Sequence, residues 1–374
     1  MNVPPEPRNK KPQQPSYKRK RQRKRQQWML PAAGLATLLA VTGCAGPGVD
    51  SDDVTLKFAE GFSASHPIAA NGSMYFLDRL REEGPDVGIS VEFYPSSQLG
   101  SFEDVPTMLS SGIADISDVV PAYLSAQLPL SSAFDLPGYT TDSCVGAAAV
   151  SRSVAEGSTA REQEIEQLGV RPLWSVLLTG YELMTSEPTT DPHGRQGAIL
   201  RSPGGAVDRV VDAMGAAGVS MPLGDMYEAA SRGTVDGTVA SPTSMAPYKL
   251  AEVLPNSTIG AELGSVAVLY SISEQQWSEL NDEQRVVVTE AAEATEQNLC
   301  AKLNELLPEA QDQMEKDGTT LHRLTPDQKS EWAQEVSMPA RENWRSDLTD
   351  MGLPAEAVLE EWEAALRKEE SADE

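Results

Sequence analysis

An arginine at the end of an expected strand, Arg201, is the residue best suited to bind an anion. Residues 197–202 are strand-like, and a helix is expected to follow directly over residues 204–215. A guanidinium offers a planar fork of donors that can bind both oxygens of a carboxylate, which an ammonium group cannot match. Backbone N–H groups at the helix start, near Gly204 and Gly205, would add positive potential on the same side. Arg201 therefore has the chemistry that a carboxylate site requires, and the alternative is a surface arginine that ends a strand.

Other polar and aromatic residues are candidates for a ligand cleft. They are Tyr123, Tyr181, Tyr227, Glu182, Gln98, His66, Ser241 and Ser244. Each tyrosine offers a flat ring with a hydroxyl, and a place in the core is an equal alternative. His66 follows the first expected strand in a loop, where a solvated histidine is the alternative. Gln98 and the two serines are candidates by position alone.

No enzyme motif accompanies these residues. The sequence contains neither Gly-x-Gly-x-x-Gly nor Gly-Lys-Ser/Thr, and it lacks the Gly-x-Ser-x-Gly elbow of α/β hydrolases. Three histidines and three cysteines form no metal-binding pattern. We therefore expect a binding protein without cofactor or metal. A surface hydrolase and a structural lipoprotein without ligand are the less favoured alternatives.

The charge of the chain is divided between a basic N-terminus and an acidic remainder. Residues 1–43 hold ten Lys and Arg and one acid, whereas the rest holds 20 Lys and Arg against 55 Asp and Glu. Such an acidic surface repels nucleic acid and anionic lipid, so no nucleic-acid partner is expected. An anion site in this protein must rely on local positive groups.

The N-terminal segment is typical of a lipoprotein signal peptide. A basic run through Arg25 precedes the apolar stretch from Trp28 to Val41, which at about 14 residues is too short to span a bilayer comfortably. Thr-Gly-Cys then ends at Cys44. We expect residues 1–43 to be the signal peptide, Cys44 to be lipidated at the outer face of the cell membrane, and residues 44–53 to be a flexible tether. An ordinary signal peptide or anchor with a chance cysteine is the alternative.

Two cysteines remain in the exported part, Cys144 and Cys300. An oxidising compartment permits a disulfide between them. Their spacing does not show that they meet, and two buried thiols are an equal alternative.

Strands and helices alternate along the chain in two sections. In the first, residues 54–58 and 87–94 are strand-like, residues 69–83 and 103–111 are helical, and a third strand begins near residue 113. The pattern restarts with strands over 170–178 and 197–202, a helix over 204–215 and a strand over 266–270. This alternation predicts parallel α/β packing.

One long helix follows these sections. Asn281 and Gln284 form a capping box, and the helix is expected to run to Leu307, just before Pro308. Its length of roughly 40 Å exceeds the width of one small domain, so it predicts a brace across two lobes.

Several motifs, taken in order, resemble the solute-binding proteins of TRAP (tripartite ATP-independent periplasmic) transporters. They are His66-Pro67, the turn Pro95-Ser96-Ser97-Gln98-Leu99-Gly100, residues 112–116, and a central block of Leu200-Arg201-Ser202-Pro203, Met221-Pro222, Met226-Tyr227-Glu228-Ala229 and Asp236-Gly237. The similarity extends from about residue 54 to residue 350.

The resemblance implies a two-lobed periplasmic-binding-protein-like α/β fold with crossing hinge strands and a long helix bridging both lobes. Residues 54–178 plus 266–305 would form lobe 1, and residues 179–265 plus 306–374 would form lobe 2 and the C-terminal helices. The implied function is an extracytoplasmic receptor that captures a small organic carboxylate in the interlobe cleft and delivers it to a membrane permease. Service to an ABC importer or a sensor kinase is the alternative.

The resemblance also assigns Arg201 to the ligand carboxylate, and it exposes two departures. Many family members carry a second arginine where this chain has Glu182, and an asparagine where it has Ala240. These absences favour a monocarboxylate over a dicarboxylate. Glu182 is either a ligand contact or a solvated edge acid.

Overall fold

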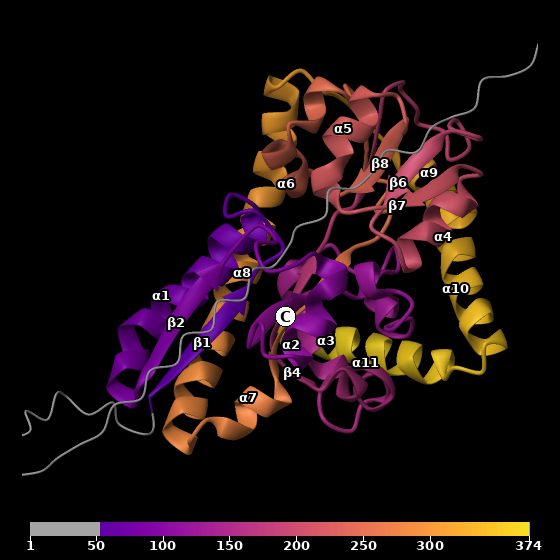
Figure 1. Ribbon diagram of the computed structural model, residues 1–374. Coiled ribbons are helices and arrows are strands. Elements are labelled where there is room, and N and C mark those ends of the chain that lie inside the picture. Colours follow the sequence, from indigo (N-terminus) through magenta and orange to yellow (C-terminus); the bar gives the residue numbers. More distant parts are fainter. Residues whose placement is uncertain (1–52, 374) are drawn as a thin grey trace, which may run out of the picture. The chain divides into compact units, whose positions relative to one another are not determined.

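The computed structural model describes residues 53–373 (Figure 1). The expected signal peptide over residues 1–43, the lipidation residue Cys44 and nearly all of the expected tether over residues 44–53 lie outside this range. Among the described residues, no helix is both long enough and apolar enough to cross a membrane.

Two sheets organise the described chain. The five strands of the first sheet lie in the order β2 (Ile89–Tyr94), β1 (Val54–Ala59), β3 (Ile116–Val119), β10 (Val266–Ser273) and β4 (Val170–Leu178). The six strands of the second sheet lie in the order β11 (Thr320–Arg323), β9 (Asn256–Ile259), β5 (Glu182–Thr185), β8 (Gly237–Ala240), β6 (Ile199–Ser202) and β7 (Ala217–Ser220). We call the first sheet with the helices packed on it lobe 1, and the second with its helices lobe 2.

Both sheets are mixed, so the expectation of parallel packing is correct only in part. β1 pairs parallel with β2 and β3, but β10 runs antiparallel to β3 and β4. In lobe 2, β6 pairs parallel with β7 and β8, and β5 runs antiparallel to β8 and β9. The antiparallel strands belong to segments that enter a sheet from the other lobe.

Helices cover both sheets. The α-helices are α1 (Met74–Glu83), α2 (Val105–Ser110), α3 (Ser143–Ser153), α4 (Ala206–Ala213), α5 (Met226–Ser231), α6 (Pro242–Met245), α7 (Glu274–Glu279), α8 (Asp282–Lys316), α9 (Pro326–Trp332), α10 (Met338–Asp350) and α11 (Ala355–Asp373). Short helical turns are η1 (Ala69–Ser73), η2 (Gly84–Val87), η3 (Phe102–Asp104), η4 (Pro121–Leu124), η5 (Ser131–Asp135), η6 (Arg161–Ile165), η7 (Glu166–Leu168), η8 (Leu223–Asp225), η9 (Ala246–Tyr248), η10 (Leu250–Glu252) and η11 (Ala333–Ser337).

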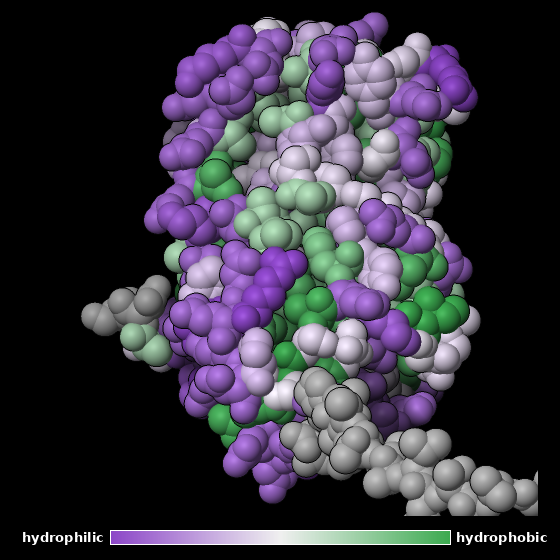
Figure 2. All heavy atoms as spheres, turned by 60° about the vertical axis from the view of Figure 1, so that its left-hand side comes forward, coloured by the Kyte–Doolittle hydropathy of each residue, from purple (hydrophilic) through white to green (hydrophobic). Residues whose placement is uncertain are grey.

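Hydrophilic side chains cover much of the upper part and flank of the face in Figure 2, as the excess of acids leads one to expect.

The chain crosses between the sheets through two short segments that lie beside each other. The first joins β4 to β5 over residues 179–181, and the second joins β9 to β10 over residues 260–265. The Tyr181 N–H donates to the Gly264 carbonyl at 3.3 Å, and the Leu263 N–H donates to the Tyr181 carbonyl at 2.7 Å. These paired segments are the crossing strands that the resemblance implies, and the two-lobed fold is confirmed.

The long helix α8 joins the lobes, although its end differs from expectation. It begins at the predicted capping box, in which the Asn281 side chain accepts from the Gln284 N–H at 2.9 Å. Leu307 is the wrong end, because α8 continues through Pro308 to Lys316. Proline removes one backbone donor, but packing maintains the helix: α8 contacts β4, α1 and α3 in lobe 1 and α6 and β11 in lobe 2. Met314, beyond the proline, is buried.

Two further contacts join distant parts of the chain. Cys144 in α3 and Cys300 in α8 form a disulfide, with their Cα atoms 4.7 Å apart. The C-terminal helices, yellow in Figure 1, pack on both lobes: α10 contacts α4, whereas α11 contacts α3 of lobe 1. Residues 306–374 were expected to lie with lobe 2. The position of α11 differs because its buried Trp362 packs against Phe134 of lobe 1, at 5.2 Å between ring centroids.

Candidate ligand-binding site

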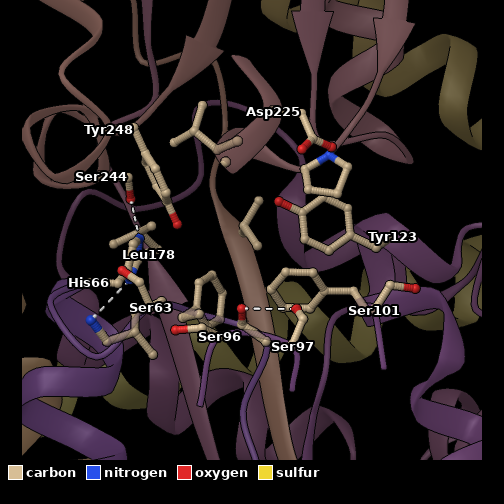
Figure 3. A pocket seen from close by; sticks show the side chains of 18 of the residues that line it. Ser63, His66, Ser96, Ser97, Ser101, Tyr123, Leu178, Asp225, Ser244 and Tyr248 are labelled. Atoms are coloured by element: carbon tan, nitrogen blue, oxygen red, sulfur yellow. Dashed lines mark hydrogen bonds between the residues drawn. The ribbon is translucent and has the colours of Figure 1, made fainter. Parts of the chain in front are cut away.

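A cavity of about 340 Å³ lies between the two lobes (Figure 3). Lobe 1 and the crossing segments contribute Gly61, Phe62, Ser63, His66, Ile68, Ser96, Ser97, Ser101, Phe102, Tyr123, Leu178, Tyr181 and Val266; lobe 2 contributes Arg201, Pro222, Leu223, Gly224, Asp225, Ser244 and Tyr248. In Figure 3, Tyr248 and Tyr123 stand on opposite sides of the space, with Ser96 and Ser97 below. Since both lobes supply its walls, a solute held there can favour their closed arrangement.

Arg201 brings a buried positive charge to this cavity. It extends from β6, which lies between β8 and the edge strand β7 in the lobe 2 sheet, and is only 1% exposed. Its Nε donates to the Met221 carbonyl at 2.7 Å, and its Nη2 donates to the Tyr123 hydroxyl, across the lobes, at 3.3 Å. Among residues 53–373, no carboxylate oxygen lies within 4.0 Å of its guanidinium nitrogens. The hydrogen-bond partners of this buried cation are neutral groups, an arrangement that favours binding of an anion.

The start of α4 does not support Arg201 as expected. Gly204 and Gly205 do not line the cavity. The Gly204 N–H donates to the Ser202 hydroxyl at 3.0 Å, and that hydroxyl in turn donates to Asp208. This local carboxylate already meets the positive end of the helix, so the expected addition to the anion site is a wrong prediction. Gly204 instead permits close approach of the lobes, because a Cβ there would lie 2.5 Å from the Ala122 carbonyl oxygen.

Two of the three candidate tyrosines line the cavity. Tyr123 stands on η4, and Tyr181 lies in the first crossing segment, where burial raises its pKa far above the usual value. The Tyr181 hydroxyl has no hydrogen-bond partner within the described chain, so as a neutral phenol it can donate to a ligand oxygen. Tyr227 lies elsewhere and donates to Glu252 at 2.8 Å.

Three other candidates also lie outside the cavity. Glu182 is 4% exposed and accepts from the Gly260 and Ala261 N–H groups at 2.7 and 3.0 Å, so it connects the two crossing segments. Burial raises its pKa to about 8. The Ser241 hydroxyl pairs with that of Thr243 at 3.0 Å, and Gln98 is exposed in its turn. Glu182 is thus neither a lining residue nor a solvated edge acid.

His66 is the second buried base of the cavity. Its ring is 1% exposed, stacks on Phe62 at 4.6 Å between centroids, and places Nε2 2.9 Å from the Ser244 hydroxyl of lobe 2. Burial lowers its pKa to about 3, so the ring is neutral. Arg201 is therefore the one cation among the described lining residues.

Several lining residues have no signal in the sequence. Phe62, Phe102, Leu178 and Val266 supply apolar wall, and Tyr248 faces the cavity from η9 with a pKa that burial raises to about 12. Tyr248 lies four residues after Ser244, a spacing that offers a weak local clue. The aromatic and aliphatic residues could be placed only with the fold in hand.

The arrangement of the lining side chains suits binding of a small solute. No group of three metal-ligating side chains occurs within residues 53–373. The cavity combines one guanidinium, tyrosine hydroxyls, apolar walls and a rim of serines with Asp225. A flat or compact apolar body with one carboxylate matches this lining.

Known proteins share both the sequence pattern and the fold. The model of the family "Bacterial extracellular solute-binding protein, family 7" matches residues 58–347. A C4-dicarboxylate-binding periplasmic protein of Rhodobacter capsulatus is 25% identical over 325 residues, covering 83% of this chain and 90% of that protein.

Two solved structures illustrate the likeness of fold. A TRAP solute-binding protein from Rhodoferax ferrireducens with copurified benzoate has a TM-score of 0.77 and 18% identity, covering 86% of this chain and 100% of that chain. One from Bordetella bronchiseptica with bound (R)- and (S)-mandelate has a TM-score of 0.74 and 19% identity, covering 84% of this chain and 99% of that chain. The chain belongs to bacterial extracellular solute-binding protein family 7, and it is an extracytoplasmic TRAP solute-binding protein rather than an enzyme.

Proposed function

We propose that the protein captures a monocarboxylate with a flat, apolar body and delivers it to a TRAP permease. The observation that carries the proposal is Arg201, a buried guanidinium that lines the interlobe cavity and has no carboxylate partner within residues 53–373. The ligand carboxylate would supply the missing anion, with the Tyr181 and Tyr123 hydroxyls beside it. Rings of Phe62 and Phe102 would contact the apolar body.

The lining favours one carboxylate over two. Arg201 is the single cation among the described lining residues, and the remaining charged residue of the wall is Asp225. A second carboxylate near Asp225 would meet repulsion without compensation. The Rhodobacter relative is named for C4-dicarboxylates, whereas two structural neighbours hold benzoate and mandelate. The charge of this cavity supports the second kind of solute for this chain.

Closure would bring lobe 1, residues 54–178 plus 266–305, against lobe 2, residues 179–265 plus 306–374 with α11 excepted. The crossing segments over residues 179–181 and 260–265 would act as the hinge. Glu182 supports this hinge, because it accepts N–H groups of the second segment while standing at the end of the first.

The solute class is tested by binding at pH 8. Isothermal titration calorimetry with benzoate, mandelate and succinate should detect benzoate or mandelate and little succinate, and binding should raise the Tm by linkage. Preference for succinate would overturn the monocarboxylate proposal. Failure of all three to bind would overturn the proposed solute class altogether.

We also propose that Cys44 carries a lipid that anchors the receptor at the outer face of the cell membrane. Its support is the basic run, the apolar stretch and the Thr-Gly-Cys end of the N-terminal segment. In cells given a clickable fatty acid, the natural chain should be labelled and sediment with membranes, and Cys44→Ala should be unlabelled. Equal labelling of both chains would refute the anchor.

A further inference from the structure

A hydrogen bond between the lobes closes the cavity on the side of His66. His66 follows β1 of lobe 1, whereas Ser244 lies on α6 of lobe 2, and the His66 Nε2 is 2.9 Å from the Ser244 Oγ. His66 is 1% exposed and Ser244 is 2% exposed. Figure 3 shows this contact beside Tyr248, at the edge of the space where a solute would lie. Separation of the lobes must break the bond and hydrate both groups.

The second ring nitrogen determines which form of the histidine can make this contact. The Ile68 N–H donates to the His66 Nδ1 at 3.3 Å, so Nδ1 must present its lone pair. The proton of the neutral ring then resides on Nε2, which donates to the Ser244 hydroxyl. In an imidazolium both ring nitrogens carry a proton. The N–H at Nδ1 would then face the N–H of Ile68, and Nδ1 could no longer accept its hydrogen bond.

The surroundings of His66 also disfavour a charged ring. Phe62 stacks on one face, and the Tyr248 ring lies 6.1 Å away on η9. The other titratable or charged groups around the cavity are Tyr123, Tyr181, Arg201 and Asp225, and Glu60 lies in the same loop as His66. Burial is the cause of the lowered pKa of His66, about 3, and none of these groups offsets it.

We propose that His66 is an interlobe latch that allows the lobes to close over a solute only while its ring is neutral. The inference rests on the proposed function in one respect, namely that solute capture requires closure. His66 is accordingly a positioning residue, which acts on affinity through the geometry of the closed lobes. It makes solute capture sensitive to acid.

The direction of the pH effect follows from the two states of the ring. In the open form a solvated histidine has a pKa of about 6.5, and in the closed form the pKa is about 3. Above pH 6.5 most rings in the open form are neutral, so closure requires no deprotonation. As the pH falls from 6.5 towards 3, closure must first remove a proton from His66 and becomes progressively less favourable. Affinity at pH 5 should be about 30-fold weaker than at pH 8, because about 30 protonated rings then exist for each neutral one in the open form.

Calorimetry at pH 8 and pH 5 tests the latch in the purified protein. The probes are benzoate, mandelate and succinate, whose binding carboxylate stays largely ionised at pH 5. The natural protein should lose about 30-fold in affinity for the probe that it binds best, and binding at pH 5.5 should release about one proton, measured in buffers of different ionisation enthalpy.

The matched variant is His66→Gln, whose amide keeps an N–H near the position of Nε2 but does not titrate. Whatever its absolute affinity, its binding should not weaken between pH 8 and pH 5, and it should release no proton at pH 5.5. Ser244→Ala should weaken binding about tenfold at pH 8, because it leaves the His66 N–H buried without an acceptor.

The outcomes separate this inference from the proposed function. Tight binding at both pH values by the natural protein would overturn the latch and leave the receptor function intact. The same acid loss in His66→Gln would also overturn it, and would point to the buried Glu60 and Asp118 pair, in which burial raises the pKa of Asp118 to about 6. Failure to bind any of the three probes would overturn both proposals.

Discussion

Two bases in the wall of the cavity are equally buried, but they differ in whether they keep a positive charge. Arg201 and His66 are each 1% exposed, and each makes a hydrogen bond to the other lobe, Arg201 to Tyr123 and His66 to Ser244. A guanidinium does not deprotonate in a protein, so Arg201 retains its charge and is stabilised by carbonyl oxygens. An imidazole can release its proton, and burial favours that release. Arg201 therefore attracts an anion, whereas His66 responds only to the pH.

Removal of the permanent charge of Arg201 should have the largest effect on solute binding. Arg201→Ala should weaken solute binding by at least about 100-fold, because the carboxylate would then be buried without a partner. Arg201→Lys should recover part of the loss, since it restores charge without the fork. Calorimetry would measure both, with Arg232→Ala as a control that should bind normally, because Arg232 is an exposed residue directly after α5. Unchanged affinity in Arg201→Ala would refute the anion site.

Steric obstruction of closure should have the next largest effect. Gly204 has a φ of 109°, and a Cβ there would lie 2.5 Å from the Ala122 oxygen of lobe 1. Gly204→Ala should therefore weaken binding by about 10- to 100-fold through strain in the closed form. Gly233→Ala is the matched control, because its φ is also positive, at 66°, but its Cβ would meet nothing within 4 Å. If both variants lose affinity equally, backbone strain alone and not contact between lobes is responsible.

The neutral donor beside Arg201 should matter less than the charge. Tyr181→Phe removes a hydroxyl that has no partner in the described chain, so binding should weaken about tenfold while the Tm of the unliganded protein is kept. Tyr227→Phe should leave affinity unchanged, because that hydroxyl lies outside the cavity and pairs with Glu252. Equal effects in the two variants would show that Tyr181 does not contact the solute.

The disulfide should affect stability and not binding. Cys144 and Cys300 are 156 residues apart in the sequence and join α3 to α8 away from the cavity. Replacement of both by alanine should lower the free energy of unfolding by about 2–5 kcal/mol, measured by denaturant titration. Solute affinity under native conditions should stay the same. A large loss of affinity would mean that the brace helix also determines the geometry of closure.

Local patterns predicted many elements well. β4 occupies the expected residues Val170–Leu178, and the capping box of Asn281 and Gln284 starts α8. Both signals lie within a few residues of the structure that they produce. The same local logic failed at Pro308, where contacts of α8 with both lobes outweigh the loss of one backbone donor.

The candidate site was predictable only where a residue type has few roles. Arg201 stood out because the resemblance to TRAP solute-binding proteins assigns this arginine to the ligand carboxylate, a role that its guanidinium suits. Glu182 was ambiguous, and the structure shows it bound to the N–H groups of Gly260 and Ala261, a contact that spans 78 and 79 residues of sequence. Phe62 and Phe102 gave no signal, because an aromatic residue in a core and one in a cavity wall look alike in a sequence.

The alternation of strands and helices, the start of the long helix and the chemical character of Arg201 could be predicted from the chain, because each depends on neighbouring residues or on a side chain's own groups. The packing of the folded chain was needed to show that strand β10 runs antiparallel, that Cys144 meets Cys300, and that His66 meets Ser244 across 178 residues of chain. Such pairings depend on how two lobes and two crossing segments pack, and side-chain spacing along the chain contains no measure of distance through space. The protonation state of His66 likewise depends on the tertiary structure, because burial and not residue type makes the ring neutral.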